Sequence, residues 1–219
     1  MTKTDIQLKQ DIEAELLWDP QVNAAQIGVS VEHGAVALSG QVDSYPARWA
    51  AEDATKRVSG VLSVSSGLGV NVRPEHQRSD SEIAATANSA LDWDIFVPTG
   101  VTAKVERGWV TLEGQVHWNY QRHSAERAVR HLMGVTGVFD SILLVPQASA
   151  SEVKEKVESA LKRQAKVDAK SIHVDTAGGK VTLSGHASSW RSIDDAKNAA
   201  WAAPGVTSVV DEVRISPTP

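Results

Sequence analysis

Apolar residues follow the same series of spacings three times along this chain. Each copy opens with apolar residues three and four positions apart, which predict a helix with one apolar face: Leu8, Ile12 and Leu16; Ile83, Ala87 and Leu91; Val153, Val157 and Leu161. A segment of alternating apolar residues follows in each copy and predicts a strand, over residues 27–31, 101–105 and 172–175. The chain is therefore an internal repeat.

A second strand is predicted in each copy by the pattern Gly-x-Val-x-Leu-x-Gly. Its first glycine supplies the positive φ of a tight hairpin turn. We expect its last glycine to prevent a clash between a β-carbon and the chain that leaves for the next helix. The pairs of glycines are Gly34 and Gly40, Gly108 and Gly114, and Gly179 and Gly185. The nearly equal intervals between them mark three units of similar length.

An alanine-rich helix and a third strand complete each copy. A Gly-Val pair follows each closing glycine at a constant interval and predicts a Schellman end to that helix, at Gly60, Gly134 and Gly205. An antiparallel hairpin followed by a right-handed parallel crossover predicts an α+β fold of three tandem αββαβ units. Each unit is a small three-stranded mixed sheet with two helices packed on it. The predicted units cover residues 1–73, 78–146 and 149–216.

This unit resembles the BON domain, the bacterial OsmY and nodulation domain. The resemblance rests on the first helix, the Gly-x-Val-x-Leu-x-Gly strand and the alanine-rich helix that ends in Gly-Val, all present in the three copies. It implies the αββαβ fold and the roles proposed for the family: phospholipid binding, envelope maintenance and protection in osmotic stress. Some cytoplasmic relatives join a BON domain to a LysM domain and sense potassium. The family has no shared catalytic motif, so the resemblance transfers no site residue.

Charge and composition narrow the classes of function. The formal net charge is −5, whereas nucleic-acid binding needs a basic surface, so we expect no nucleic-acid partner. The chain has no cysteine, which excludes disulfides, thiolate nucleophiles and cysteine zinc sites. It also lacks the P-loop, Gly-x-Ser-x-Gly and His-Glu-x-x-His motifs. The sequence therefore predicts a protein that is not an enzyme and binds neither a cofactor nor a metal.

Basic and aromatic residues gather in the second unit. His123, Arg127 and His131 have the i, i+4 spacing of one helical face. That face is either ordinary solvated surface or an anion-attracting surface whose charge grows as the histidines protonate. The candidate contact residues here are His117, Trp118, Tyr120, Arg122, His123, Arg127, Arg130 and His131.

Seven tryptophans are many for a chain with two phenylalanines and two tyrosines. Trp49 and Trp201 are further contact candidates, which we expect on the helix face away from the alanines. We expect Trp109 to face outward from its strand, and Trp118 and Tyr120 to lie in a loop. Amphipathic rings near arginine suit a membrane interface, and they also suit packing between domains or protomers.

These observations favour a non-enzymatic protein that associates with anionic phospholipid surfaces in osmotic or envelope stress. Two alternatives stay open: a self-associating scaffold, with a homo-oligomer or another protein as partner, and a cytoplasmic sensor of a small ion such as potassium or of a ligand. The first residues contain no apolar segment of a secretory signal. This predicts a cytoplasmic location, peripheral to the inner membrane, or a periplasmic one if an export segment precedes Met1.

Overall fold

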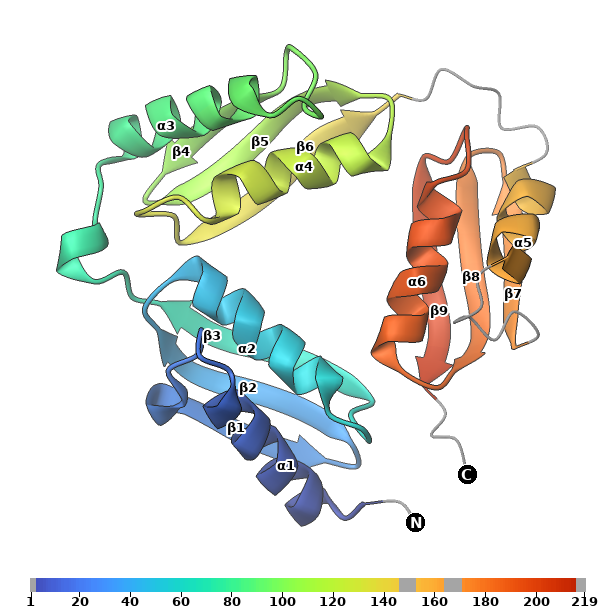
Figure 1. The fold of residues 1–219 in the computed structure, drawn as a ribbon, viewed down its shortest axis with the longest axis horizontal. Coiled ribbons are helices and arrows are strands. Elements are labelled where there is room, and N and C mark those ends of the chain that lie inside the picture. Colours follow the sequence, from blue (N-terminus) through green and yellow to red (C-terminus); the bar gives the residue numbers. More distant parts are fainter. Residues whose placement is uncertain (1–2, 146–152, 164–170, 216–219) are drawn as a thin grey trace. The chain divides into compact units, whose positions relative to one another are not determined.

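The computed structural model contains three similar sheets. It describes residues 3–145, 153–163 and 171–215. Each sheet has three strands, in the orders β1-β2-β3, β4-β5-β6 and β7-β8-β9. In each repeat both helices lie on one face of the sheet (Figure 1). This is the α+β architecture of αββαβ units that the sequence predicts. By backbone proximity the chain divides into two units, 1–114 with 122–142 and 115–121 with 143–219.

The elements recur in the same order in each repeat. The first contains α1 (Asp5–Trp18), β1 (Ile27–Glu32), β2 (Ala35–Val42), α2 (Tyr45–Arg57) and β3 (Ser63–Val70). The second contains α3 (Asp80–Trp93), β4 (Thr102–Glu106), β5 (Trp109–Val116), α4 (Asn119–Arg130) and β6 (Gly137–Leu144). The third contains α5 (Val153–Arg163), β7 (Ile172–Ala177), β8 (Lys180–Ala187), α6 (Trp190–Trp201) and β9 (Ser208–Ile215). In the first and third sheets the hairpin is antiparallel and the crossover pair is parallel.

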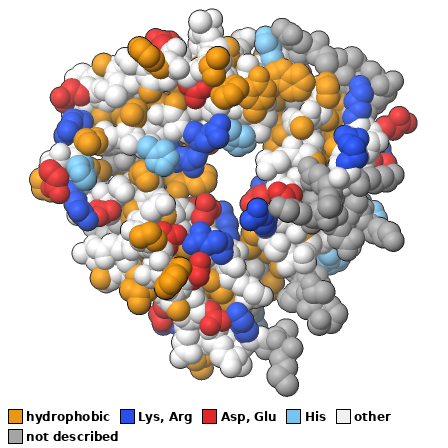
Figure 2. Space-filling view, viewed as in Figure 1, with side chains coloured by type: hydrophobic (Ala, Val, Ile, Leu, Met, Phe, Trp, Pro, Cys, Tyr) orange, Lys and Arg blue, Asp and Glu red, His pale blue; other side chains and the backbone are white. Residues whose placement is uncertain are grey.

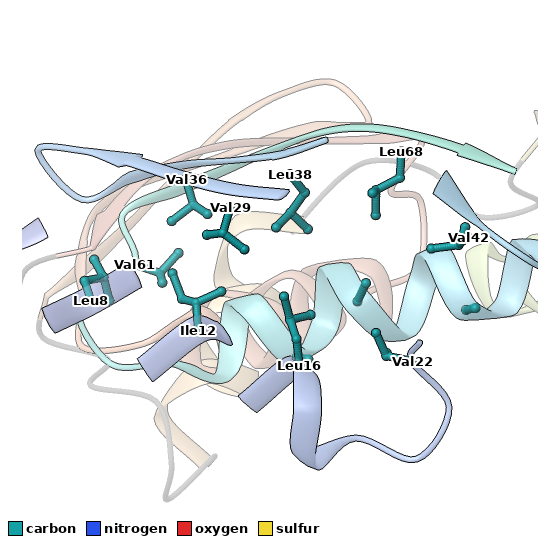
Figure 3. Close-up of a cluster of buried hydrophobic side chains, with 13 residues drawn as sticks. Leu8, Ile12, Leu16, Val22, Val29, Val36, Leu38, Val42, Val61 and Leu68 are labelled. Carbon is teal, nitrogen blue, oxygen red and sulfur yellow. The ribbon is translucent and has the colours of Figure 1, made fainter. Parts of the chain in front are cut away.

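The core of each repeat lies between its helices and its sheet. In the first repeat Leu8, Ile12 and Leu16 point from α1 toward Val36 and Leu38 of β2 (Figure 3). The alanines of α6 and all but one of the alanines of α2 are buried, as expected, and Ala50 is partly buried. Small side chains let these helices approach the strands closely. The hydrophobic spacing in the sequence thus identifies the core correctly.

The first helix of a repeat also holds its hairpin turn. In the first repeat the carboxylate of Asp5 accepts hydrogen bonds from the backbone N–H groups of His33, at 2.8 Å, and Gly34, at 3.2 Å. Both turn residues have positive φ, including His33 at 49°, and Asp80 holds the turn of the second repeat in the same way. In the third repeat Gly178 takes the positive φ. The expectation that Gly179 does so is wrong.

Two further expectations about glycine are wrong in detail. A β-carbon at Gly40 would lie 2.0 Å from the carbonyl oxygen of Gln26. The clash is therefore with the chain entering β1, not with the chain leaving β2. The helices also end three or four residues before the Gly-Val pairs, α2 at Arg57 and α6 at Trp201, so these glycines do not form Schellman caps. They lie instead in the turn that leads to the third strand.

An ion pair ties the two helices of the first repeat together, and it predicts a pH effect. Arg57 donates to Glu15 and to Asp19, both at 2.9 Å, and its bond lowers the pKa of Asp19. The stability that follows from a lowered carboxyl pKa is present above the ordinary value of about 4 and is lost as the pH falls. Arg57→Gln should thus lower the free energy of unfolding by about 1 kcal/mol at neutral pH, and by progressively less below about pH 4.

Urea unfolding at several pH values tests this. Lys9→Gln is the matched control, because Lys9 makes only an exposed contact with Glu13 at 3.7 Å. A loss in Arg57→Gln that stayed constant into acid would show that Asp19 and Glu15 are not the cause.

Candidate functional site

Helix α4 exposes one stripe of aromatic and basic side chains. Tyr120, His123 and Arg127 are exposed along it, and His131, directly after the helix, continues it. The opposite face is buried, as Ala125 and Val129 have no exposed surface. Figure 2 shows pale blue histidine and blue basic side chains gathered over this helix. The structure thus brings together four of the candidate residues, which we call the α4 stripe.

Arg122 and Arg130, the other arginines of α4, each contact a side chain that makes them less available to bind an anion. The Nε atom of Arg122 lies 3.1 Å from the carboxylate of Asp140 on β6, and Arg122 is about a quarter exposed. The guanidinium carbon of Arg130 lies 4.5 Å from the centre of the Trp49 ring, within cation–π distance. Arg127 donates instead to the hydroxyl of Ser124 at 2.9 Å. Because Ser124 is neutral, this bond holds the side chain of Arg127 without cancelling its charge.

One carboxylate borders the stripe. Oε2 of Glu126 lies 3.8 Å from Nδ1 of His123. The pKa of Glu126 is lowered, mainly by its interaction with His123, although burial raises it. Glu126 therefore stays ionised and offsets part of the positive charge that His123 carries when it is protonated. Arg127 is then the main source of net positive charge on the stripe.

The segment before α4 is held in place by the helix itself. The side-chain oxygen of Gln121 accepts hydrogen bonds from the backbone N–H groups of His117 and Trp118, both at 3.0 Å. Nδ1 of His117 lies 2.7 Å from the carbonyl oxygen of Val145. Trp118 is 38% exposed, and Tyr120 lies in the first turn of α4 rather than in a loop. An aromatic pair thus lies at the N-terminal end of the stripe.

The stripe is specific to the second repeat. The equivalent positions, aligned on the closing glycines, are Pro46, Trp49, Asp53 and Arg57 in α2, and Arg191, Asp194 and Asn198 in α6 with Ala202 directly after it. Each of these sets contains an aspartate, whereas the α4 stripe contains none. The residues that differ between repeats therefore concentrate basic charge on one helix.

Comparison with known proteins matches the BON domain family to residues 4–71, 79–146 and 149–217. The chain belongs to the BON domain family. It is similar to Osmotically-inducible protein Y of Escherichia coli (strain K12), with 31% identity over 145 residues, which span 62% of this chain and 72% of that protein. Two solved structures of CdsD, a structural protein of the Type III secretion system of Chlamydia trachomatis, match with 16% identity and TM-scores of 0.28 and 0.27. They cover 93% and 100% of those chains and 97% and 99% of this one, but TM-scores this low carry no argument.

One tryptophan of this BON protein, Trp201, does not lie where the sequence predicts it. Trp201 is partly buried and packs against the core of the third repeat, so it does not point away from the alanine face. The reason is its position at the last turn of α6, where the core extends past the helix end to Val206. Trp109 faces outward as expected and is 49% exposed. The contact roles of Trp49 and Trp201 stay predictions.

Sequence reasoning missed the most exposed aromatic residues. Trp18 at the end of α1 and Trp93 at the end of α3 are 83% and 89% exposed, and Ile95 after α3 is 90% exposed. Their spacing from the buried residues could have indicated this exposure. Trp18 comes two residues after the buried Leu16, and residues two apart do not lie on the same face of a helix. The two tryptophans occupy equivalent positions in two BON repeats.

Two other classes of site, a metal centre and a membrane span, are absent from the described ranges. Residues 3–145, 153–163 and 171–215 contain no group of three or more His, Asp or Glu side chains that could hold a metal ion. Within these same ranges no helix is long and apolar enough to cross a membrane.

Proposed function

We propose that this BON protein acts in osmotic or envelope stress by attaching to anionic phospholipid surfaces through the α4 stripe. The observation that carries the proposal is the stripe itself: exposed Arg127 and two histidines on one helix face, with exposed Trp118 and Tyr120 at its end. The similarity to an osmotically inducible protein supports the stress context. In this arrangement the basic side chains attract lipid phosphates and the aromatic rings lie at the level of the headgroups.

The charges on the stripe set the strength of this attachment. A basic side chain near an anionic surface contributes about 1 kcal/mol. One arginine therefore provides only weak attraction. The attachment is reversible and sensitive to salt.

Replacing Arg127 by glutamate should reduce binding to anionic vesicles about tenfold or more, because it reverses the charge at the centre of the stripe. The measurement is co-sedimentation with phosphatidylglycerol and phosphatidylcholine vesicles at low and high salt. Arg191→Glu is the matched control, since it makes the same change of charge at an exposed position on α6.

Two outcomes would contradict the proposal: no sedimentation with either lipid, or an equal loss in both variants.

A further inference from the structure

The open face of the second sheet, opposite its helices, carries large apolar side chains. Trp109 of β5 is 49% exposed, and Phe139 and Leu143 of β6 are each 61% exposed. The ring of Trp109 lies over Gly137 of the neighbouring strand, since a β-carbon built on Gly137 would come within 2.6 Å of it. Trp109 on β5 and Phe139 and Leu143 on β6 thus expose apolar surface on two strands of the same sheet face.

The other two repeats have no such area at the same positions. The residues equivalent to Trp109, Phe139 and Leu143 are Ala35, Ser65 and Gly69 in the first repeat, and Lys180, Val210 and Arg214 in the third. The fold itself therefore does not require large apolar side chains on this face. An exposed apolar patch of this kind marks a binding surface.

The charged residues of the same face indicate what covers it. Lys104 and Glu113 form an ion pair of 2.6 Å on the open face and are 71% and 42% exposed. Glu106 and Arg107 form a second, more exposed pair at the hairpin end. Equal numbers of positive and negative groups offer no net attraction to an anionic membrane or to nucleic acid. They match a surface with the same balanced charges, which a second copy supplies when the two are related by a two-fold axis.

We propose that the open face of the β4-β5-β6 sheet is the interface between two copies of this protein. The apolar side chains of the two copies pack face to face, as the sheets of a β-sandwich do, and Lys104 of each copy lies near the acidic groups of the other. Strands β5 and β6 have eight residues and β4 has five, so the sheet is at most roughly 26 Å long and about 14 Å across. An area of at most about 360 Å² per copy is smaller than the roughly 800 Å² per partner of a standard specific interface, so the dimer is weak and depends on concentration.

This interface is separate from the α4 stripe, since α4 lies on the other face of the same sheet. Dimerisation therefore needs no lipid, and it leaves the stripe exposed. Each dimer would present two stripes, which would strengthen attachment to a surface by avidity.

The absence of cysteine makes a direct test available. Ser141→Cys places a thiol on the open face of β6, two residues from Phe139, and Ser65→Cys places one at the position equivalent to Phe139 in the first repeat. Under mild oxidation without lipid we expect a disulfide-linked dimer from Ser141→Cys and little or none from Ser65→Cys. Equal cross-linking of the two variants, or none from either, would overturn the proposal.

Sedimentation velocity provides an independent criterion. From about 1 to about 500 µM the wild-type protein should shift from monomer toward dimer, while Phe139→Ser, which copies the residue of the first repeat, should stay monomeric. Circular dichroism checks that this exposed substitution leaves the fold intact. A wild-type monomer over the whole range, or a Phe139→Ser variant that dimerises like the wild type, would exclude this face as the interface.

Discussion

Gly40→Ala should destabilise the first repeat by roughly 3 kcal/mol or more. Gly40 has a φ of 111°, and a left-handed conformation costs about 1–2 kcal/mol for any other residue. Its new β-carbon would also lie 2.0 Å from the carbonyl oxygen of Gln26. That backbone cannot move away freely, because Ile27 is paired with Gly40 across the hairpin, so overpacking adds about 1–3 kcal/mol.

Gly67→Ala is the matched control in the same sheet. Its β-carbon would meet the carbonyl oxygen of Leu38 at 3.5 Å, an ordinary contact. Urea unfolding of both variants, followed by circular dichroism, provides the comparison. If the two lost the same stability, the close approach at Gly40 would not be the reason for glycine in the signature.

Asn88→Ala should cost the second repeat about 3 kcal/mol. The side chain of Asn88 on α3 donates to the carbonyl oxygen of Ala103 at 3.0 Å and accepts from its N–H group, also at 3.0 Å. Ala103 lies in the edge strand β4, so these two backbone groups point away from the sheet. Alanine at position 88 would leave both without their partner, at about 1–3 kcal/mol each.

Ser89→Ala, an exposed change on the same helix, is the control and should have little effect. The comparison can use urea unfolding together with hydrogen exchange, which should show faster exchange of the Ala103 amide in Asn88→Ala. An unchanged amide would mean that water replaces the asparagine without cost.

The order of elements was predictable because it depends on local periodicity. Spacings of three and four define a helix face, and alternation defines a strand face, whatever lies elsewhere in the chain. Leu8, Ile12 and Leu16 are accordingly buried. Glycine was recognised at the correct positions, but the atom that excludes a side chain at Gly40 belongs to Gln26, which is distant in sequence. No local pattern reveals that approach.

The candidate site was likewise predictable only in part. Helical spacing correctly placed His123, Arg127 and His131 on one exposed stripe. It could not show that Arg122 pairs with Asp140 of a strand or that Trp201 packs against a core. Both contacts depend on how a strand or a helix end packs in the tertiary structure, which helical spacing does not describe.

The sequence alone determined that this protein is a chain of three αββαβ repeats of the BON type, since each repeat contains its own periodic signals. Only the tertiary structure decided which basic residues stay exposed on α4 and that Trp109 and Phe139 lie together on an open sheet face. The physical reason is that a sheet places side chains from separate strands about 5 Å apart. Whether a side chain is covered or available there depends on neighbours that the linear pattern does not identify.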